Sequence, residues 1–195
     1  MNYPIVLNFK VFSLARQASL VDNDGNSVAF ARQKLLKLKE QLEVFRDKTQ
    51  SKRVCNIKAD RVIDFRAIYT FFTEDNETIG SIKREGMRSF WKATYQLKDG
   101  IGAQLATIHE ENPFAKVLDS FLGDIPVLGL FCNYLFNPSY LVTNAAGQDV
   151  FRITKSPSLW GGLFTIDKLA EVSPEEEIIH LMGLLMMIFM EKQRG

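Results

Sequence analysis

The sequence predicts a fold that is mainly β with α: a closed antiparallel β-barrel of about 12 strands that encloses a hydrophobic C-terminal α-helix. Two observations carry this prediction. Most of the chain consists of short stretches with the alternating polarity of strands, and the segment 174–193 reads as a helix that is apolar on every side. A helix without a polar face must be enclosed, and a barrel that encloses it has no exposed edge strand.

The C-terminal helix has a clear beginning in the sequence. Ser173 is a good capping residue, Pro174 suits the first helical position, and Glu175–Glu177 place negative charge at the positive end of the helix dipole. Ser173 and Glu176 also have the spacing of a capping box. These signals predict a helix that starts in water and then enters the core.

From Ile178 to Met190 only His180 and Gly183 interrupt the apolar run. The run is about 20 Å long at the helical rise, which is too short for a hydrocarbon core of roughly 30 Å. We therefore expect a core helix and no transmembrane segment. We expect His180 to be a core histidine bonded to a strand backbone, with a ligand role as the alternative, and Gly183 to allow a strand to approach closely.

A recurring sequence unit supports the prediction of antiparallel strands. In three places a polar turn leads into a strand, and the turn residues are Gly25, Asn76 and Gly147. Each is followed three and six positions later by apolar or small residues, namely Val28 and Ala31, Ile79 and Ile82, and Val150 and Ile153. Turns of this kind connect antiparallel strands. Further strand-like stretches at 5–12, 54–59, 66–73 and 102–108 fill the spaces between the units.

One interruption has helical spacing. Near 113–122, apolar residues recur at positions 114, 117, 118, 121 and 122, which predicts a short amphipathic helix. The whole segment 112–136 is expected to be an insertion or an elaborated connection. We expect residues 1–195 to form a single barrel domain, because a chain of this length suits one core.

The segments Phe9–Leu14, Val21–Asn26 and Lys34–Leu38, together with the repeated polar turns, resemble the N-terminal pattern of the LURP-one-related proteins. These belong to the tubby C-terminal-like superfamily, which includes the phospholipid scramblases. The resemblance covers most of the chain, although its motifs are degenerate. It implies a twelve-stranded barrel around a central C-terminal helix. The segment 112–136 departs from the family pattern, and the calcium-binding segment of scramblases has no counterpart here.

Charge is distributed unevenly along the chain. The net charge is +1, but eleven Lys and Arg face five Asp and Glu between Arg32 and Arg66. Alternate residues of a strand project from one face, so this region could form a basic patch outside the barrel that attracts an anionic phospholipid headgroup. The alternative is an ordinary solvated face. The candidate residues are Lys34, Lys37, Lys39, Lys52, Arg53, Lys58 and Arg61.

No catalytic motif is present. The sequence lacks a nucleophile elbow, a phosphate-binding glycine loop, a dinucleotide fingerprint and a zinc-protease motif. Only two histidines are available, so we expect no metal and no cofactor. Cys55 and Cys132 are far apart, and no signal peptide precedes them, which favours a reduced, cytoplasmic setting. An enzyme is therefore less expected than a binding protein.

Three functions remain open at this point. The first is a non-catalytic cytosolic binding or regulatory module of the LURP-one-related type, which binds anionic, phosphoinositide-like lipid as a peripheral protein. The second is a small-molecule binding protein or an enzyme with a pocket at a barrel mouth. The third is a scaffold that binds a protein partner through 112–136. Nucleic acid is an improbable partner, because the net charge is near zero and no recognition module is present.

Overall fold

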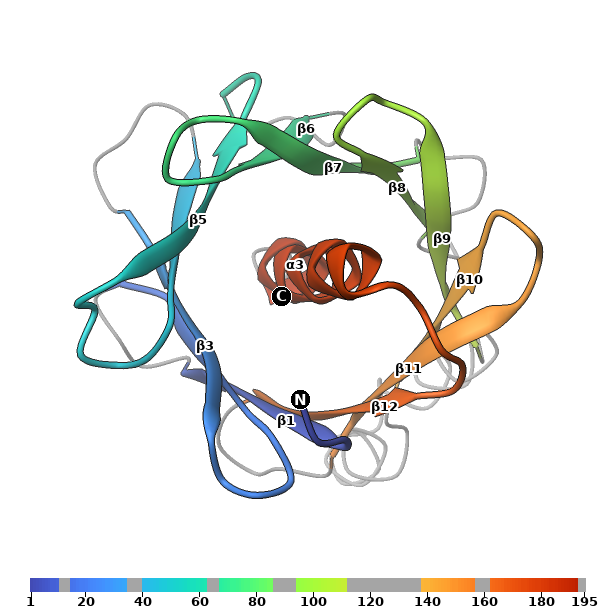
Figure 1. Cartoon of the computed structure of the whole chain (residues 1–195), viewed down its shortest axis with the longest axis horizontal. Coiled ribbons are helices and arrows are strands. Elements are labelled where there is room, and N and C mark those ends of the chain that lie inside the picture. The colour runs from blue at the N-terminus through green and yellow to red at the C-terminus, as the bar shows by residue number, and fades with distance from the viewer. Residues whose placement is uncertain are drawn as a thin grey trace, which may run out of the picture.

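The computed structural model describes residues 1–10, 15–34, 40–62, 67–85, 94–111, 138–156 and 162–192. Within these ranges, twelve antiparallel strands close into a barrel around one C-terminal helix, α3 (Pro174–Lys192), as Figure 1 shows. The predicted fold class is confirmed. The predicted helix near 113–122 and the segment 112–136 lie outside the described residues.

Strands that follow one another in the chain pair with one another, and β1 closes the barrel against β12. The strands are β1 (Ile5–Lys10), β2 (Gln17–Val21), β3 (Ser27–Gln33), β4 (Gln41–Phe45), β5 (Arg53–Ala59), β6 (Ile68–Phe72), β7 (Thr78–Arg84), β8 (Thr94–Asp99), β9 (Gln104–Glu110), β10 (Ser139–Asn144), β11 (Asp149–Lys155) and β12 (Gly162–Lys168). This up-and-down order leaves no edge strand unpaired.

The two mouths of the barrel differ. We call the end at which α3 begins the first mouth and the end at which α3 finishes the second mouth. At the first mouth, hairpin turns of four to seven residues join β2 to β3, β4 to β5, β6 to β7, β8 to β9 and β10 to β11. The opposite ends of these strands lie at the second mouth. Lys10 and Lys34 therefore belong to the second mouth, whereas Lys52 belongs to the first.

All five hairpins use the same turn. In each, the fourth residue of the turn has a positive φ and its N–H donates to the carbonyl of the first residue, as Gly25 does to Asp22 at 3.0 Å. The pairing register shifts beside every turn, which marks a β-bulge. The positive-φ residues are Gly25, Gln50, Asn76, Gly102 and Gly147, so the three predicted turn residues are confirmed.

Helix α3 fills the barrel. Every residue from Ile179 to Met190 is buried, against the inward-facing side chains of the strands. Small inward residues such as Ala18, Ala31 and Ala106 leave room for the helix. At Gly183 an added Cβ would lie 2.8 Å from Leu97 Cδ1, which confirms the expected close approach of a strand.

The predicted start of α3 is also confirmed. The Ser173 N–H donates to the carboxylate of Glu176 at 3.1 Å, and the Glu176 N–H donates to the Ser173 hydroxyl at 3.2 Å, which is a reciprocal capping box. Among the described residues, no helix combines the length and the hydropathy that a membrane span requires.

Candidate anion-binding surface

The predicted basic residues lie on the outer wall of the barrel and beside it, and they are spread along its height. Lys34, Lys58 and Arg61 lie at or near the second mouth, because each is at the end of β3 or β5 or just beyond it. Lys52 and Arg53 lie at the opposite end of β5. Lys37 and Lys39 lie outside the described residues. The structure therefore does not gather the described five residues at one point.

Two of them do converge, on a carboxylate that the sequence prediction missed. Glu43 faces outward from β4, yet its side chain is only 7% exposed. Its carboxylate oxygens lie 2.9 Å from Lys34 Nζ, 3.4 Å from Arg53 Nη1 and 3.6 Å from Arg32 Nη2. Three cations thus surround one anion. We call these four residues the Glu43 cluster.

The Glu43 cluster follows from strand register. Arg32 on β3 and Asn56 on β5 lie directly opposite Glu43 on its two sides. Burial opposes the charged carboxylate, but the hydrogen bond and charge of Lys34, with the help of Arg53 and Arg32, lower the pKa of Glu43. The cluster therefore keeps a net positive charge with its cations held in place. Arg32 could have been added to the predicted basic patch from the sequence, because it lies two residues before Lys34 and therefore on the same strand face.

Two of the three remaining predicted residues, Lys58 and Arg61, have local side-chain partners. Lys58 Nζ lies 5.0 Å from the ring centroid of Phe72. Arg61 Nη2 donates to Asp60 at 2.9 Å, which neutralises its charge. Lys52 is exposed in the turn between β4 and β5. Among these three, Arg61 is thus the least suited to bind an added anion.

A surface pocket of about 190 Å³ lies on the outer wall, and Phe30, two residues before Arg32 on β3, is among its lining residues. Two lysines line it, Lys10 from β1 and Lys48 from the turn between β4 and β5, and none of its described lining residues is a carboxylate. The other lining residues are Asn8, Gln17, Ala18, Ser19, Phe30 and Gln50. The pocket therefore offers two ammonium groups and several neutral hydrogen-bonding groups around an aromatic ring, which suits an anion with several oxygen atoms. We call it the outer-wall pocket.

The turn between β4 and β5 lies against the wall and forms one side of this pocket. The Ser27 hydroxyl donates to the Arg46 carbonyl at 3.1 Å, which fastens the turn beside β3. Phe30 and Phe45 are register partners that face outward, but they are only 5% and 8% exposed. The Arg32 guanidinium lies 6.0 Å from the Phe45 ring centroid, so the pocket and the Glu43 cluster share a continuous surface.

The outer-wall pocket could be found only in part from sequence. Asn8 and Lys10 alternate with buried residues on β1, so their outward orientation is predictable. Lys48 lies within the basic stretch of the sequence. Nothing in the sequence, however, indicates that a turn after β4 meets β1, because that contact depends on barrel closure.

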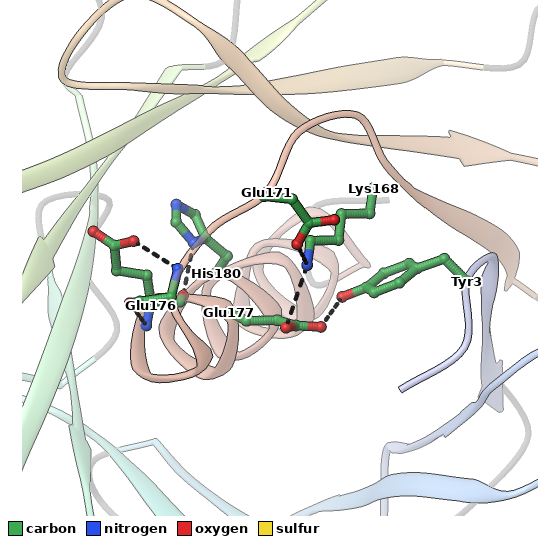
Figure 2. Close-up of polar contacts among 7 residues, drawn as sticks. Tyr3, Lys168, Glu171, Glu176, Glu177 and His180 are labelled. Atoms are coloured by element: carbon green, nitrogen blue, oxygen red, sulfur yellow. Dashed lines mark hydrogen bonds and ion pairs between the residues drawn. The ribbon is translucent and has the colours of Figure 1, made fainter.

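The first mouth has a second polar cluster, shown in Figure 2. The Tyr3 hydroxyl donates to Glu177 at 2.8 Å, and Lys168 Nζ lies 2.8 Å from Glu171 and 3.6 Å from Glu177. Burial and then the bond to Glu177 raise the pKa of Tyr3, which keeps the phenol protonated. The groups satisfy one another, and they fasten the start of α3 to the segment before β1 and to β12.

His180 lies in the core, as expected, but its partner differs from the prediction. Its Nδ1 lies 2.7 Å from the Glu176 carbonyl of its own helix, and not from a strand carbonyl. Burial lowers the pKa of His180, so the ring is neutral and Nδ1 is the donor. No group of three or more potential metal ligands occurs among the described residues. Burial also raises the pKa of Cys55 to about 12, so its thiol is unreactive.

A small pocket opens near the second mouth between the wall and α3. It is lined by Tyr69, Met186 and Phe189 among others, and its volume is about 10 Å³. That volume holds at most one water molecule. This pocket therefore cannot serve the alternative of a small-molecule site at a barrel mouth.

No protein-family model matches the chain, and a search among curated proteins finds no significant match.

Proposed function

We propose that the protein is a non-catalytic binding module of the cytoplasm that attaches peripherally to membranes, where its outer-wall pocket holds the phosphate groups of an anionic, phosphoinositide-like lipid. The observation that carries the proposal is the pocket itself, whose lining, in the part of the chain that the structure describes, has two lysines and no carboxylate. Its volume of about 190 Å³ is below the range of drug-sized ligand sites and suits a headgroup.

Charge around the pocket supports this ligand class. The Glu43 cluster has three cations and one anion. The turn 46–52 carries three cations and one carboxylate, whereas the turns 22–26 and 73–77 carry only carboxylates. The turn that lines the pocket is thus the one positively charged turn among the five hairpins. Such a concentration of charge attracts an anionic surface.

The architecture supports the family resemblance as well. A twelve-stranded barrel around a C-terminal helix is what a relationship to the LURP-one-related proteins implies, and we propose the chain as a member of the tubby C-terminal-like group. This part of the proposal concerns the ancestry of the chain. The proposed lipid site depends on the pocket and not on the family relationship.

Co-sedimentation with vesicles tests the lipid site. The full chain is mixed at low salt with phosphatidylcholine vesicles, with vesicles that also contain phosphatidylserine, and with vesicles that contain phosphatidylinositol bisphosphate. We expect binding to be strongest to the last. Soluble inositol trisphosphate added as a competitor shows whether the headgroup alone is bound. Absence of binding to phosphatidylinositol bisphosphate vesicles at low salt would refute the proposal, because electrostatic attraction is strongest there.

Matched variants locate the site. Lys10→Gln with Lys48→Gln removes both pocket lysines, and we expect a loss of about 2 kcal/mol, which is about thirtyfold in affinity. Lys83→Gln with Lys98→Gln is the control, because it makes the same charge change at exposed lysines on β7 and β8. Equal losses in both double variants would show that net charge, and not the pocket, determines binding.

A further inference from the structure

The turn 46–52 between β4 and β5 exposes two hydroxyl groups beside the outer-wall pocket. Thr49 and Ser51 are both exposed, and their hydroxyl oxygens lie 3.1 Å apart. Thr49 lies in the chain between Lys48 and Gln50, which both line the pocket. Consecutive Cα atoms are only about 3.8 Å apart, so a group added to Thr49 lies at the rim of the pocket.

Cations flank Thr49 in the sequence. Arg46 lies three positions before it, Lys48 directly before it and Lys52 three positions after it, and all three are exposed. Protein kinases distinguish their acceptor segments by charge patterns of this kind. A basic residue three positions before a hydroxyl is the pattern that suits a kinase with an acidic substrate groove.

Strand β2 has the same spacing in Arg16 and Ser19, and Ser19 also lines the pocket. Ser19, however, is paired with Asn8 on β1 and with Phe30 on β3, so its backbone is held on both sides. The turn around Thr49 belongs to no strand. A kinase must enclose the backbone on either side of the acceptor, which the sheet prevents at Ser19 and the exposed turn permits at Thr49.

We propose that Thr49 is a phosphorylation site whose modification switches off anion binding at the outer-wall pocket. Oγ1 of Thr49 attacks the γ-phosphorus of ATP, the new O–P bond forms, the bond to the leaving ADP breaks, and the hydroxyl proton passes to the kinase. In the unmodified chain this hydroxyl donates to Asp47 at 2.5 Å. The effect on binding rests on the proposed lipid site, whereas the modification itself does not.

A phosphate on Thr49 changes the charge at the pocket rim. The turn has three cations and one carboxylate, and a phosphothreonine carries a charge of about −1.5 to −2, so the positive charge of the turn is cancelled. The phosphate also offers Lys48 an anion within its own turn, with which a lipid phosphate must compete. Asp47, which loses its bond to the hydroxyl, then faces a second anion. All these changes weaken the binding of a lipid phosphate.

Phosphorylation in vitro tests the site on the full chain. The protein is incubated with magnesium ATP and the catalytic subunit of the cyclic-AMP-dependent protein kinase, and the phosphate is located by peptide mass spectrometry. We expect phosphate on Thr49 and none on Ser19, and we expect the phosphopeptide to be lost in the isosteric variant Thr49→Val. An unmodified Thr49 after complete reaction of a control peptide, or phosphate on Ser51 in its place, would overturn the assignment.

Binding measurements test the switch. Unmodified and phosphorylated chains are compared at low salt with phosphatidylinositol bisphosphate vesicles and with soluble inositol trisphosphate. We expect phosphorylation to weaken vesicle binding about thirtyfold and Thr49→Glu to weaken it about fivefold, since each charge near an anionic surface changes the affinity about fivefold. Thr78→Glu is the matched control, because it makes the same charge change at an exposed threonine beside the turn 73–77.

The outcomes separate the switch from the lipid site. If the unmodified chain binds neither probe, the lipid site and the switch are both refuted, while the phosphorylation of Thr49 is decided by its own experiment. If the unmodified and phosphorylated chains bind equally well, the switch alone is refuted. Equal losses in Thr49→Glu and Thr78→Glu would show that net charge, and not the position at the rim, determines the effect.

Discussion

The Tyr3 hydroxyl donates a hydrogen bond of 2.8 Å to the carboxylate of Glu177, across 174 residues of sequence. Tyr3 lies just before the first strand and Glu177 in the first turns of α3 (Figure 2). The bond therefore joins the beginning of the barrel to the beginning of the helix inside it. Lys168, on the last strand, approaches the same carboxylate at 3.6 Å, so the segment before β1 and the strand β12 both contact the helix at this point.

Tyr3→Phe should lower the free energy of unfolding by about 1.5 kcal/mol, because a hydrogen bond to a charged acceptor contributes about that much or more. Urea unfolding of the wild-type chain and the variant measures the change. Glu177→Gln and the double variant complete a cycle, and we expect the two effects to be less than additive. Fully additive effects would show that the two side chains do not interact in solution.

Gly183→Ala tests how tightly α3 fits the barrel. Alanine improves the helix by about 1 kcal/mol, but overpacking a core costs about 1–3 kcal/mol. The new methyl group would lie 2.8 Å from Leu97 Cδ1, and Leu97 is completely buried, so we expect overpacking to prevail with a net loss of about 1 kcal/mol. Thermal unfolding checks the sign. In a Leu97→Val background the loss should shrink, and a stabilising Gly183→Ala would mean that the contact is loose.

The fold could be predicted because its signals are local. A helix without a polar face requires an enclosure, and the spacing after Gly25, Asn76 and Gly147 marks hairpins that use one turn. The same spacing after Gly102 leads to Leu105 and Ile108, in the predicted strand-like stretch 102–108, so this hairpin has the same signal. The turn at Gln50 has no such signal, because glutamine rarely adopts a positive φ.

The candidate site was less predictable, for a physical reason. Strand pairing decides which cations lie close together. A carboxylate that lies among them offsets part of their positive charge and so weakens their attraction for an added anion. Lys34 and Arg53 are 19 positions apart, and only the β3–β4–β5 register brings them to Glu43. The pocket between Lys10 and Lys48 depends further on the closure of the barrel and on the turn that lies across the wall.

Leu184→Asp should abolish soluble folding. Leu184 is completely buried in the middle of α3, and a carboxylate without a partner there costs about 4 kcal/mol or more, which is a large fraction of the roughly 5–15 kcal/mol stability of an ordinary domain. Solubility after expression and circular dichroism measure the outcome. The matched control is Ile178→Asp, because Ile178 is 47% exposed near the start of the same helix, where water solvates the new carboxylate. A Leu184→Asp chain with native spectra would contradict the enclosed position of the helix.

His180 should make the protein sensitive to acid. Burial lowers its pKa in the folded state, while the Glu176 carbonyl and the charges of Glu176 and Glu177 oppose this, and the ring of Phe151 lies 5.3 Å away. In the unfolded chain the pKa returns to about 6.5. Above that pH the ring is neutral in both the folded and the unfolded state, so its titration does not change the free energy of unfolding. Below it the unfolded chain takes up a proton first, so stability falls as the pH decreases toward the folded pKa.

Urea unfolding at neutral and at mildly acidic pH measures this loss. We expect His180→Gln to lose less stability than the wild-type chain over the same pH interval, because the variant has no group that titrates at this position. Its stability at neutral pH is compared separately, since the replacement also changes the hydrogen bond to Glu176. His109→Gln, at the chain's other histidine, is the matched control. An equal loss in His180→Gln and the wild-type chain would assign the acid sensitivity to other groups.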